Sequence, residues 1–490
     1  MRIVQIASEI APFSKSGGLA DVVGALSEAL VAAGHEVWTV SPRYRGVASG
    51  AVPTEITVSP SLGGRPQPAR LLHLEGPGVQ HLFVDHRAFD RDGLYGDLHG
   101  TFGDNHMRFA LLCQAALAAA HHLVGPHAVL HAHDWQAALL PIYLEAAWRP
   151  LGLLPHTTTV LTLHNPMHQG RLGAAAFADL ELPARWFSPW GLELHGDLCL
   201  LKGGILHAQQ LTTVSPTFAR EILTPGGGFG LEGVLAGRAT DLIGILNGLD
   251  THTWDPQADP HLPAAFSATD LSGKAVCKSE LQAGLGLPVD PSAPLVASVG
   301  RLDPQKGVEL LADSIPWLVQ QGAQVVALGS AAAAHRHLEH RLATLEEAHP
   351  HHVRAWIGYS EALAHTIQAA ADLFVMPSLF EPCGLTQMSA MRYGTVPVVR
   401  RTGGLADSVT PFMPGDPAED REDSGTGFLF GPPTGRALRD ALWRALSLYH
   451  TDPKAFQRLQ VRGMSTDLSW KTAAAAYVEV YAQAKALRAR

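Results

Sequence analysis

A lysine followed by paired glycines stands near the start of the chain. Residues Lys15–Leu19 read KSGGL and lie between a short apolar run and a helical pattern. Glycines let a backbone approach an anion, and the N–H groups at a helix N-terminus point towards it. Lys15 adds a full positive charge. Taken alone, the segment also fits an ordinary turn, but its place after a first strand favours phosphate binding.

Two further cations share one loop in the second half of the chain. Arg301 and Lys306 belong to GRLDPQKG at residues 300–307, directly after an apolar run. A guanidinium can donate two parallel hydrogen bonds to one phosphate, and an ammonium adds a compact positive charge. Together these two groups suit a diphosphate. Without other motifs, the pair fits a solvated loop equally well.

An isolated glutamate follows another apolar run. Glu381 belongs to FEPCGLTQ at Phe380–Gln387, where Pro382 and Gly384 predict a turn before a helix. The unpaired N–H groups of that helix could face a phosphate. Alone, Glu381 is slightly more typical of a helix N-terminal acid that balances the helix dipole.

Histidines follow two other apolar runs, in HAHDWQ at His131–Gln136 and in LHN at Leu163–Asn165. Histidine and aspartate are metal ligands, but no third ligand follows at a metal-like spacing. The chain has 26 histidines, so one close pair is weak support for a metal site. We therefore predict no metal, and expect these polar side chains to bind sugar hydroxyls.

The motifs fall at the ends of short apolar runs that alternate with helical patterns such as Ala20–Ala33. Such alternation predicts an α/β chain with parallel sheets, whose ligands bind beyond the carboxyl ends of the strands. The predicted strands are Arg2–Ala7, Glu36–Val40, Ala128–His131, Thr159–Leu163, Gln210–Val214, Leu242–Leu246, Leu295–Val299, Gln324–Leu328, Leu373–Met376 and Val396–Val399.

A chain of 490 residues is long for one hydrophobic core, so two domains are expected. Residues Asn247–Ser272 are rich in Pro, Asp, Thr and Ala and lack periodicity, which is typical of a linker. Apolar residues at helical spacing in Ala473–Ala486 predict a last helix that needs a partner surface.

Bulk composition excludes several classes of protein. Hydrophobic residues make up 46% and charged residues 17%, with a formal net charge of −9, so we expect a globular protein that binds neither nucleic acid nor membrane surfaces. The N-terminus lacks the pattern of a secretion signal, and no run of about 18 apolar residues suggests a membrane span. The four cysteines form no C-x-x-C pair, which suits the reducing cytoplasm.

Together, these motifs resemble those of bacterial glycogen synthases and plant starch synthases, over nearly the whole chain and in the same order. Further matching segments are Thr213–Thr217, Asn247–Gly248, Ile357–Glu361 (IGYSE) and Arg400–Val409 (RRTGGLADSV). The resemblance implies the GT-B fold, in which two Rossmann-like domains face each other across an interdomain cleft. It implies an acceptor-side domain at residues 1–248, completed by a helix at 470–490, and a nucleotide-sugar-binding domain at 249–469.

The resemblance also implies a role for each matching residue. Those at the reacting centre would be Glu381, Lys306, Arg301 and His164. Those that bind the donor would be Lys15, Gly18, Asn247, Tyr359, Cys383, Gly384, Leu385 and Thr386, with Tyr359 near the adenine and Asn247 at the glucose. Those on the sugar and acceptor side would be Asp21, His133 and Asp134. Ser389 is a departure, since many related retaining transferases carry a second glutamate there.

The implied activity is transfer of glucose from ADP-glucose to the non-reducing end of an α-1,4-glucan primer such as glycogen, with retention of configuration and without a cofactor. The residues alone leave UDP-glucose open as the donor. They also leave open a covalent intermediate or same-face attack in an ion pair. A dinucleotide-dependent oxidoreductase is disfavoured because G-x-G-x-x-G is missing. The remaining alternatives are a glucan-binding protein without activity and a pyridoxal-phosphate phosphorylase of the same fold.

Overall fold

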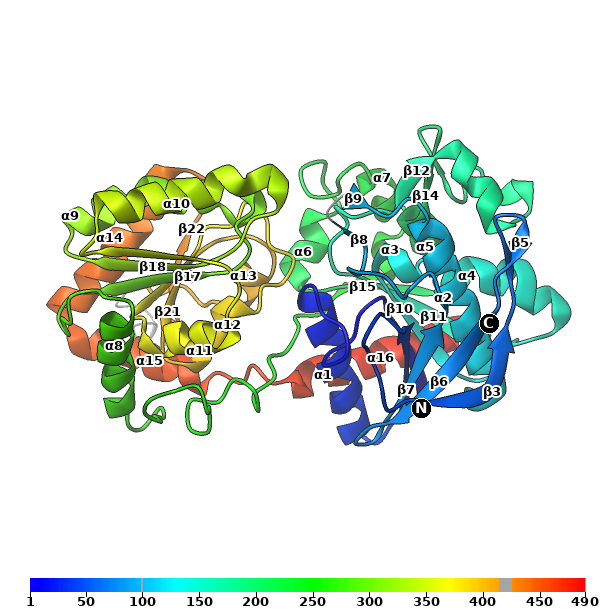
Figure 1. Ribbon diagram of the computed structural model, residues 1–490, viewed down its shortest axis with the longest axis horizontal. Helices are drawn as coiled ribbons and strands as arrows, with labels where there is room; N and C mark the ends of the chain where they lie inside the picture. Colours follow the sequence, from blue (N-terminus) through cyan, green and yellow to red (C-terminus); the bar gives the residue numbers. More distant parts are fainter. Residues whose placement is uncertain (98–99, 414–424, 490) are drawn as a thin grey trace. The chain divides into compact units, whose positions relative to one another are not determined.

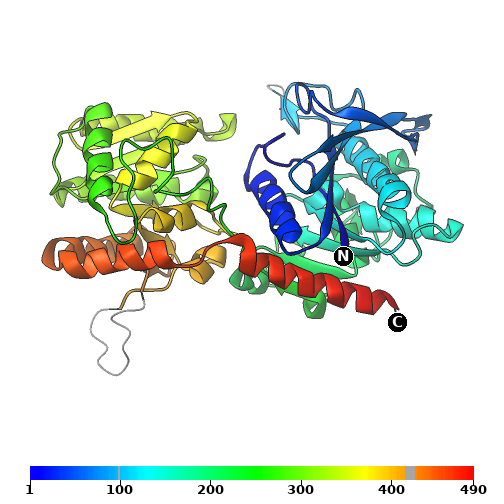
Figure 2. The same ribbon diagram turned by 90° about the horizontal axis from the view of Figure 1, so that it is seen from below.

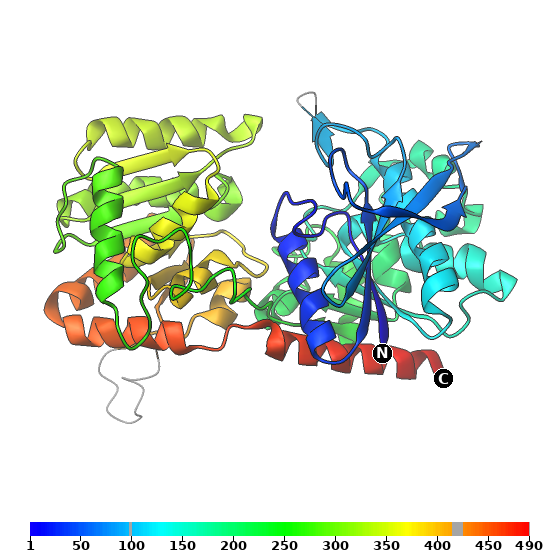
Figure 3. The same ribbon diagram turned by 60° about the horizontal axis from the view of Figure 1, so that its bottom comes forward.

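The computed structural model describes residues 1–97, 100–413 and 425–489, and Figure 1 shows the arrangement of helices and strands. The chain forms two compact units. Unit 1 consists of Met1–Gly248 and Trp470–Arg490, and unit 2 consists of Leu249–Ser469. Both chain ends therefore belong to unit 1, where Figure 3 marks them.

Unit 1 is built on a nine-stranded sheet. In spatial order its strands are β16 (Leu242–Gly244), β15 (Gln210–Thr213), β11 (Thr158–Leu163), β10 (Val129–His133), β1 (Arg2–Ile6), β2 (Glu36–Pro42), β7 (Val79–Asp85), β6 (Ala69–Glu75) and β3 (Val52–Val58). Pairing is parallel from β16 to β7, and β6 and β3 continue the sheet in antiparallel pairing. The small strands are β4 (Ser61–Leu62), β5 (Arg65–Pro66), β8 (Gly96–Asp97), β9 (Gly100–Thr101), β12 (Arg171–Gly173), β13 (Glu193–Leu194) and β14 (Asp197–Cys199).

Helices cover both faces of this sheet because successive strand residues point to opposite sides. Ile3 of β1 packs in one core with helices α1 (Gly18–Ala32) and α16 (Trp470–Ala489), whereas Val4 packs in the other core with α2 (Asn105–Ala119). The remaining helices of unit 1 are α3 (Asp134–Ala137), α4 (Leu140–Tyr143), α5 (Leu200–His207), α6 (Pro216–Glu221) and α7 (Glu232–Ala236).

The last helix, α16, packs against α1 and β11, and Figure 2 shows it running along unit 1. Its alanine-rich sequence favours a helix. Trp470, Tyr477, Val480 and Tyr481 are buried in the core that it shares with α1. The buried face is the apolar stripe that the sequence shows at helical spacing.

Within the described part of the chain, one helical segment is long and apolar enough to cross a membrane. It spans Asn105–Val124, has a mean hydropathy of 1.3 and is 72% buried inside unit 1. It comprises α2 and a one-turn extension at Ala120–Val124. Its apolar residues fill the core under the sheet, which accounts for its composition.

Unit 2 is built on a six-stranded parallel sheet. In spatial order its strands are β19 (Val353–Ile357), β18 (Gln324–Gly329), β17 (Leu295–Val299), β20 (Leu373–Met376), β21 (Val396–Arg400) and β22 (Phe428–Phe430). The predicted α/β class with parallel sheets is thus confirmed. Trp356 is 49% exposed because β19 is an edge strand.

Helices also cover both faces of the unit 2 sheet (Figure 1). One face packs against α9 (Val308–Gln320), α10 (Arg336–Ala348), α14 (Gly435–Thr451) and α15 (Pro453–Ser465). The other face carries α8 (Ser272–Gly284), α11 (Glu361–Ala370) and α12 (Thr386–Arg392), and the short α13 (Gly403–Ser408) follows β21.

The segment 249–271 lacks helices and strands, as expected of a linker, but it packs firmly on unit 2. The Trp254 indole stacks on the His365 ring at 3.9 Å between centroids. The buried Asp259 carboxylate accepts hydrogen bonds from His365 Nδ1 at 2.7 Å and from the Tyr393 hydroxyl at 2.5 Å. The first 23 residues of unit 2 are therefore held by specific side-chain contacts.

Candidate functional site

A buried glutamate accepts hydrogen bonds from the KSGGL loop of unit 1. Glu9 follows β1, and its Oε1 accepts hydrogen bonds from Ser16 Oγ at 2.8 Å and from the Tyr95 hydroxyl at 2.6 Å. The backbone N–H of Ser16 donates to Oε2 of the same carboxylate. Neither Glu9 nor Tyr95 was predicted from the sequence, although the position of Glu9 just beyond the first strand was a usable signal.

Lys15 of the same loop forms an ion pair with Asp21 of α1. Their Nζ and Oδ1 atoms lie 2.8 Å apart, and both side chains are well exposed. Gly18 begins α1, and Gly17 before it has no side chain to cap the helix, so the first N–H groups face outward from an open backbone. A lysine beside a helix N-terminus is an arrangement that can bind an anion.

Asp134 directly follows β10, and His164 directly follows β11. Asp134 Oδ1 accepts hydrogen bonds from the backbone N–H of His164 at 2.7 Å and of Asn165 at 3.4 Å. Burial raises the pKa of Asp134 to about 7 despite these two N–H donors. Burial lowers the pKa of His164 to about 3, so that imidazole is neutral at physiological pH. Asp134 thus orders the loop that presents His164.

His133 differs from our expectation of a sugar contact. Its ring is fully buried, with Nδ1 2.9 Å from His164 Nε2 and Nε2 2.7 Å from Gln5 Oε1. Both ring nitrogens are therefore used inside unit 1, and none is left for a sugar hydroxyl. The HAHD pattern did not reveal this because His133 is the last residue of β10 and points into the sheet core.

Asn247 lies just beyond β16, the edge strand of the same sheet. Its side chain is buried, and its Oδ1 has no hydrogen-bond partner among the residues that the structure describes. A buried amide oxygen without a partner costs free energy, roughly 1–3 kcal/mol. A ligand hydroxyl or a water molecule would satisfy it.

In unit 2 the structure brings Lys306 and Glu381 together. Lys306 Nζ lies 2.7 Å from Glu381 Oε2, and Ser378 Oγ donates to the same oxygen at 3.0 Å. Glu381 is only 4% exposed, so the pair lies in a largely desolvated place. Over residues 1–97, 100–413 and 425–489, no hydrogen bond reaches Oε1, which leaves this oxygen for a ligand.

Local backbone geometry sets the direction of Lys306. The Asp303 side chain caps the turn Pro304–Lys306 by accepting from the Gln305 N–H at 2.8 Å. Gly307 then has φ +66°, and a Cβ there would lie 2.1 Å from the Pro377 carbonyl oxygen. A glycine is needed because the β17 loop passes this close to the β20 loop. Arg301, on the same β17 loop, is exposed.

The predicted donor-binding residues of unit 2 also follow the carboxyl ends of strands. Gly384 has φ +72° and turns the chain into α12, with Leu385 at its N-terminus and Thr386 in its first turn. The Cys383 side chain is buried, so only its backbone can face a ligand. Tyr359, beyond β19, is 79% exposed, which leaves its ring available for stacking.

The backbone of Glu381 rests on a second glycine pair. The Gly404 N–H donates to the Glu381 carbonyl oxygen at 3.1 Å. Gly403 has φ +42°, and a Cβ on it would lie 1.9 Å from that oxygen. Any side chain at residue 403 must therefore displace Glu381.

We expect Gly403→Ala to lower kcat by about 10²-fold, the scale of a misplacement near 1 Å. Gly284→Ala is the matched control, because a Cβ at Gly284 in α8 meets no atom within 4 Å. Steady-state turnover and thermal unfolding of both variants test this. Unchanged kcat in Gly403→Ala would show that Glu381 need not be held in place.

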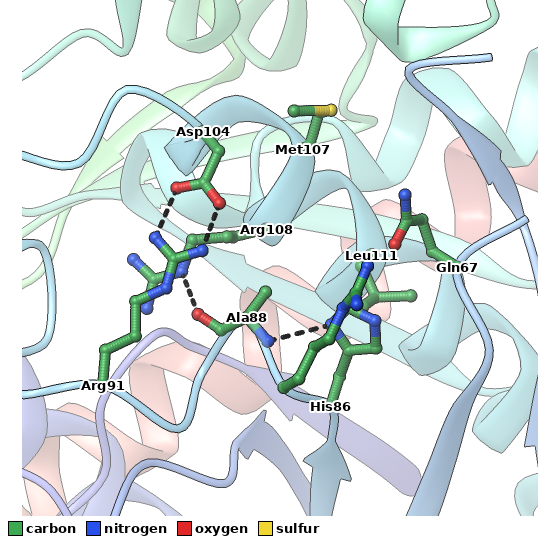
Figure 4. A pocket seen from close by; sticks show the side chains of 9 residues that line it. Gln67, His86, Ala88, Arg91, Asp104, Met107, Arg108 and Leu111 are labelled. Atoms are coloured by element: carbon green, nitrogen blue, oxygen red, sulfur yellow. Dashed lines mark hydrogen bonds and ion pairs between the residues drawn. The ribbon is translucent and has the colours of Figure 1, made fainter. Parts of the chain in front are cut away.

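A cavity of about 350 Å³ lies elsewhere in unit 1, between the loop after β7 and the start of α2 (Figure 4). It is lined by Gln67, His86, Arg87, Ala88, Arg91, Asp104, Met107, Arg108 and Leu111, none of them a predicted site residue. Three of its charged side chains, Arg91, Asp104 and Arg108, are bonded within unit 1. Arg91 pairs with Asp104 through two hydrogen bonds, and the buried Arg108 donates to the carbonyl oxygens of Ala88 and Leu94.

A sequence profile described as the starch synthase catalytic domain matches residues 2–237, and one described as glycosyl transferases group 1 matches residues 286–458. A glycogen synthase of Anaeromyxobacter dehalogenans is 46% identical over 98% of this chain and 98% of its own length. The chain belongs to the glycogen synthase and starch synthase family. Soluble starch synthase 1 of Solanum tuberosum is 40% identical over 98% of this chain and 78% of its own length.

Solved structures agree with this assignment. The catalytic domain of starch synthase IV from Arabidopsis thaliana, bound to ADP and acarbose, is 35% identical, with a TM-score of 0.90 over 99% of each chain. Sucrose-phosphate synthase from Thermosynechococcus elongatus has a TM-score of 0.62 at 18% identity over 99% of each chain, and shares the fold. The expected GT-B class and the expected glycosyltransferase family are both confirmed.

Proposed function

We propose that this family member transfers glucose from ADP-glucose to the non-reducing end of an α-1,4-glucan with retention of the α-configuration. The observation that carries the proposal is the pairing of Lys306 with the buried Glu381 at the carboxyl edge of the unit 2 sheet. The ADP bound to the starch synthase IV catalytic domain supports an adenine nucleotide as the leaving group.

Cations and backbone N–H groups stabilise the negative charge of the leaving group. Negative charge develops on the nucleoside diphosphate as the glycosidic bond breaks, and fixed donors in a dry site stabilise it without reorganising. Lys306 and Arg301 on unit 2 and Lys15 on unit 1 supply the charges. The backbone N–H groups of Gly18, Leu385 and Thr386 supply further donors.

Glu381 acts on the donor sugar. Lys306 and Ser378 hold its Oε2, so Oε1 is directed to a ligand hydroxyl or to the positive charge that develops at the anomeric carbon. We assign Glu381 this orienting and stabilising role. A retained α-configuration follows from either a covalent intermediate or attack on the same face, and both routes use the same cations.

Unit 1 supplies groups for sugars. Asn247 offers a buried amide oxygen that needs a donor, and a sugar hydroxyl is such a donor. His164 is neutral and Asp134 titrates near neutrality, so both can exchange hydrogen bonds with hydroxyl groups. Asp21 stands beside Lys15 on the acceptor side. The thiols of the four cysteines, all buried and without disulfides, suit the cytoplasmic location that we propose.

The test of the donor is a transfer assay with maltoheptaose as acceptor and either ADP-glucose or UDP-glucose. We expect a higher kcat/KM with ADP-glucose. A preference for UDP-glucose would overturn the assignment of the donor.

We also expect turnover to survive EDTA, because lysine, arginine and backbone N–H groups already neutralise the diphosphate. Initial rates with ADP-glucose should agree before and after chelation and desalting. A loss of rate that magnesium or manganese alone restores would contradict this prediction.

A further inference from the structure

A chain of buried hydrogen bonds leads from the last helix to His164. The Gln5 Nε2 group donates to the Tyr481 hydroxyl oxygen at 3.3 Å, and Gln5 Oε1 lies 2.7 Å from His133 Nε2. His133 Nδ1 lies 2.9 Å from His164 Nε2. Gln5, His133 and Tyr481 are fully buried, so water does not compete for these bonds.

This series of hydrogen bonds has a donor-to-acceptor direction because an amide oxygen can only accept a hydrogen bond. With Oε1 of Gln5 facing it, His133 Nε2 must carry the hydrogen. Burial holds the pKa of His133 well below its usual value, so the ring is neutral and its Nδ1 is a bare acceptor. His164 Nε2 must then carry a hydrogen that it donates to His133.

The hydrogen bonds of Tyr481 at the far end of this series are consistent with this orientation of Gln5. The hydroxyl of Tyr481 lies 2.8 Å from His131 Nδ1, and His131 Nε2 lies 2.5 Å from Thr162 Oγ1. When Tyr481 donates its one hydrogen to His131, its oxygen is left to accept from the Gln5 amide. A reversed Gln5 side chain would place its oxygen against Tyr481 and its NH₂ group against His133. The hydrogens of His133 and His164 would then lie on Nδ1 of each ring.

We propose that Tyr481, Gln5 and His133 are positioning residues that hold His164 as the Nε2–H tautomer. His164 then meets the donor sugar through a bare Nδ1, which accepts a hydrogen bond from a sugar hydroxyl. Within the described residues no protein group bonds to this Nδ1. The inference rests on the proposed function for its ligand, but the tautomer itself is a property of the free protein.

This assignment gives α16 a part in the site besides packing. Tyr481 belongs to α16 and lies 350 residues along the chain from its partner His131. It also restricts the role of His164. A neutral ring whose only N–H is bound to His133 can accept a hydrogen bond from the sugar but cannot act as a general acid towards the leaving group.

The proton positions can be read directly. Neutron diffraction from crystals of the unliganded wild-type protein, exchanged in deuterium oxide, should show deuterium on Nε2 of both His133 and His164. Deuterium on Nδ1 of His164 would overturn the proposal. Because this measurement needs no turnover, it stands apart from any failure of the proposed function.

A double-mutant cycle tests the consequence for catalysis with ADP-glucose and maltoheptaose. Gln5→Met removes both polar atoms, and we expect kcat/KM to fall roughly tenfold, about the effect of one buried hydrogen bond. In a His164→Ala background the same Gln5→Met change should have almost no effect, because Gln5 acts through His164. Equal losses in both backgrounds would overturn the positioning role.

Two further variants separate positioning from stability. Thr158→Val removes a buried hydrogen bond between β11 and α16, from Thr158 Oγ1 to the Ala484 carbonyl oxygen at 3.1 Å, without touching the chain to His164. It should lower Tm but leave kcat/KM unchanged. Gln5→Glu still accepts from His133 Nε2 and should restore most of the activity that Gln5→Met loses. Failure of this rescue in a folded Gln5→Glu protein would count against the proposed direction of the chain.

Discussion

Replacing Lys306 with alanine is expected to lower kcat about 10²–10³-fold, the usual effect of removing one donor to a developing anion. Two losses combine in this variant. The diphosphate loses a cation, and the Glu381 carboxylate, 4% exposed, keeps only the Ser378 hydroxyl on its Oε2. A buried charge without its partner also changes the position of the side chain that carries it. Release of ADP from ADP-glucose in the presence of maltoheptaose measures the effect.

The control for Lys306→Ala is Lys454→Ala, which removes the same charge from an exposed position on α15. Its kinetics should match those of the wild type. Thermal unfolding of both variants shows whether the fold is kept. Near-normal kinetics in Lys306→Ala would remove Lys306 from the site and with it the proposed account of the leaving group.

Ending the chain at Ser469 is expected to abolish both cooperative unfolding of unit 1 and activity. The deletion removes α16 and uncovers the sheet face that packs on Trp470, Tyr477 and Tyr481. Fully burying a large apolar side chain contributes about 1.5–3 kcal/mol. Three such losses are comparable with a whole domain's stability of about 5–15 kcal/mol. Calorimetry should show a transition for unit 2 alone.

The matched control for this deletion ends the chain at Ala486. It keeps the buried residues of α16 and removes only residues 487–490. We expect wild-type unfolding and turnover from it. A chain ending at Ser469 that keeps full turnover would contradict the role that we give to α16.

Sequence periodicity predicted ten of the parallel strands because they are buried on both faces and read as apolar runs, but it missed the parallel strands β7 and β22. Leu295–Val299 and Leu373–Met376 have the predicted bounds. The antiparallel strands β3 and β6, the last two strands of the sheet, were missed because they mix exposed with buried residues. Strand β19 was missed for the same reason, as its sequence VRAWI places Trp356 on an exposed edge.

For the site, sequence could predict which residues follow strand ends but not which of them meet. Lys306 and Glu381 lie on two strand-end loops and are 75 residues apart in the sequence. Parallel strands predict that such loops share one edge of the sheet, but not that these two side chains pair. The hydrogen bonds that hold these site residues in place could not be predicted from the sequence. Glu9 and Tyr95 lie 86 residues apart, and Gln5 and Tyr481 lie 476 apart, so no local pattern links them.

The central claim is tested most directly by incubating the wild-type protein with ADP-glucose and a maltooligosaccharide, and following ADP release and the new anomeric proton by NMR. The account predicts one ADP for each glucose added, with the new unit in an α-1,4-linkage at the non-reducing end. ADP release without chain growth, a β-linked product, or no release from a folded protein would contradict it.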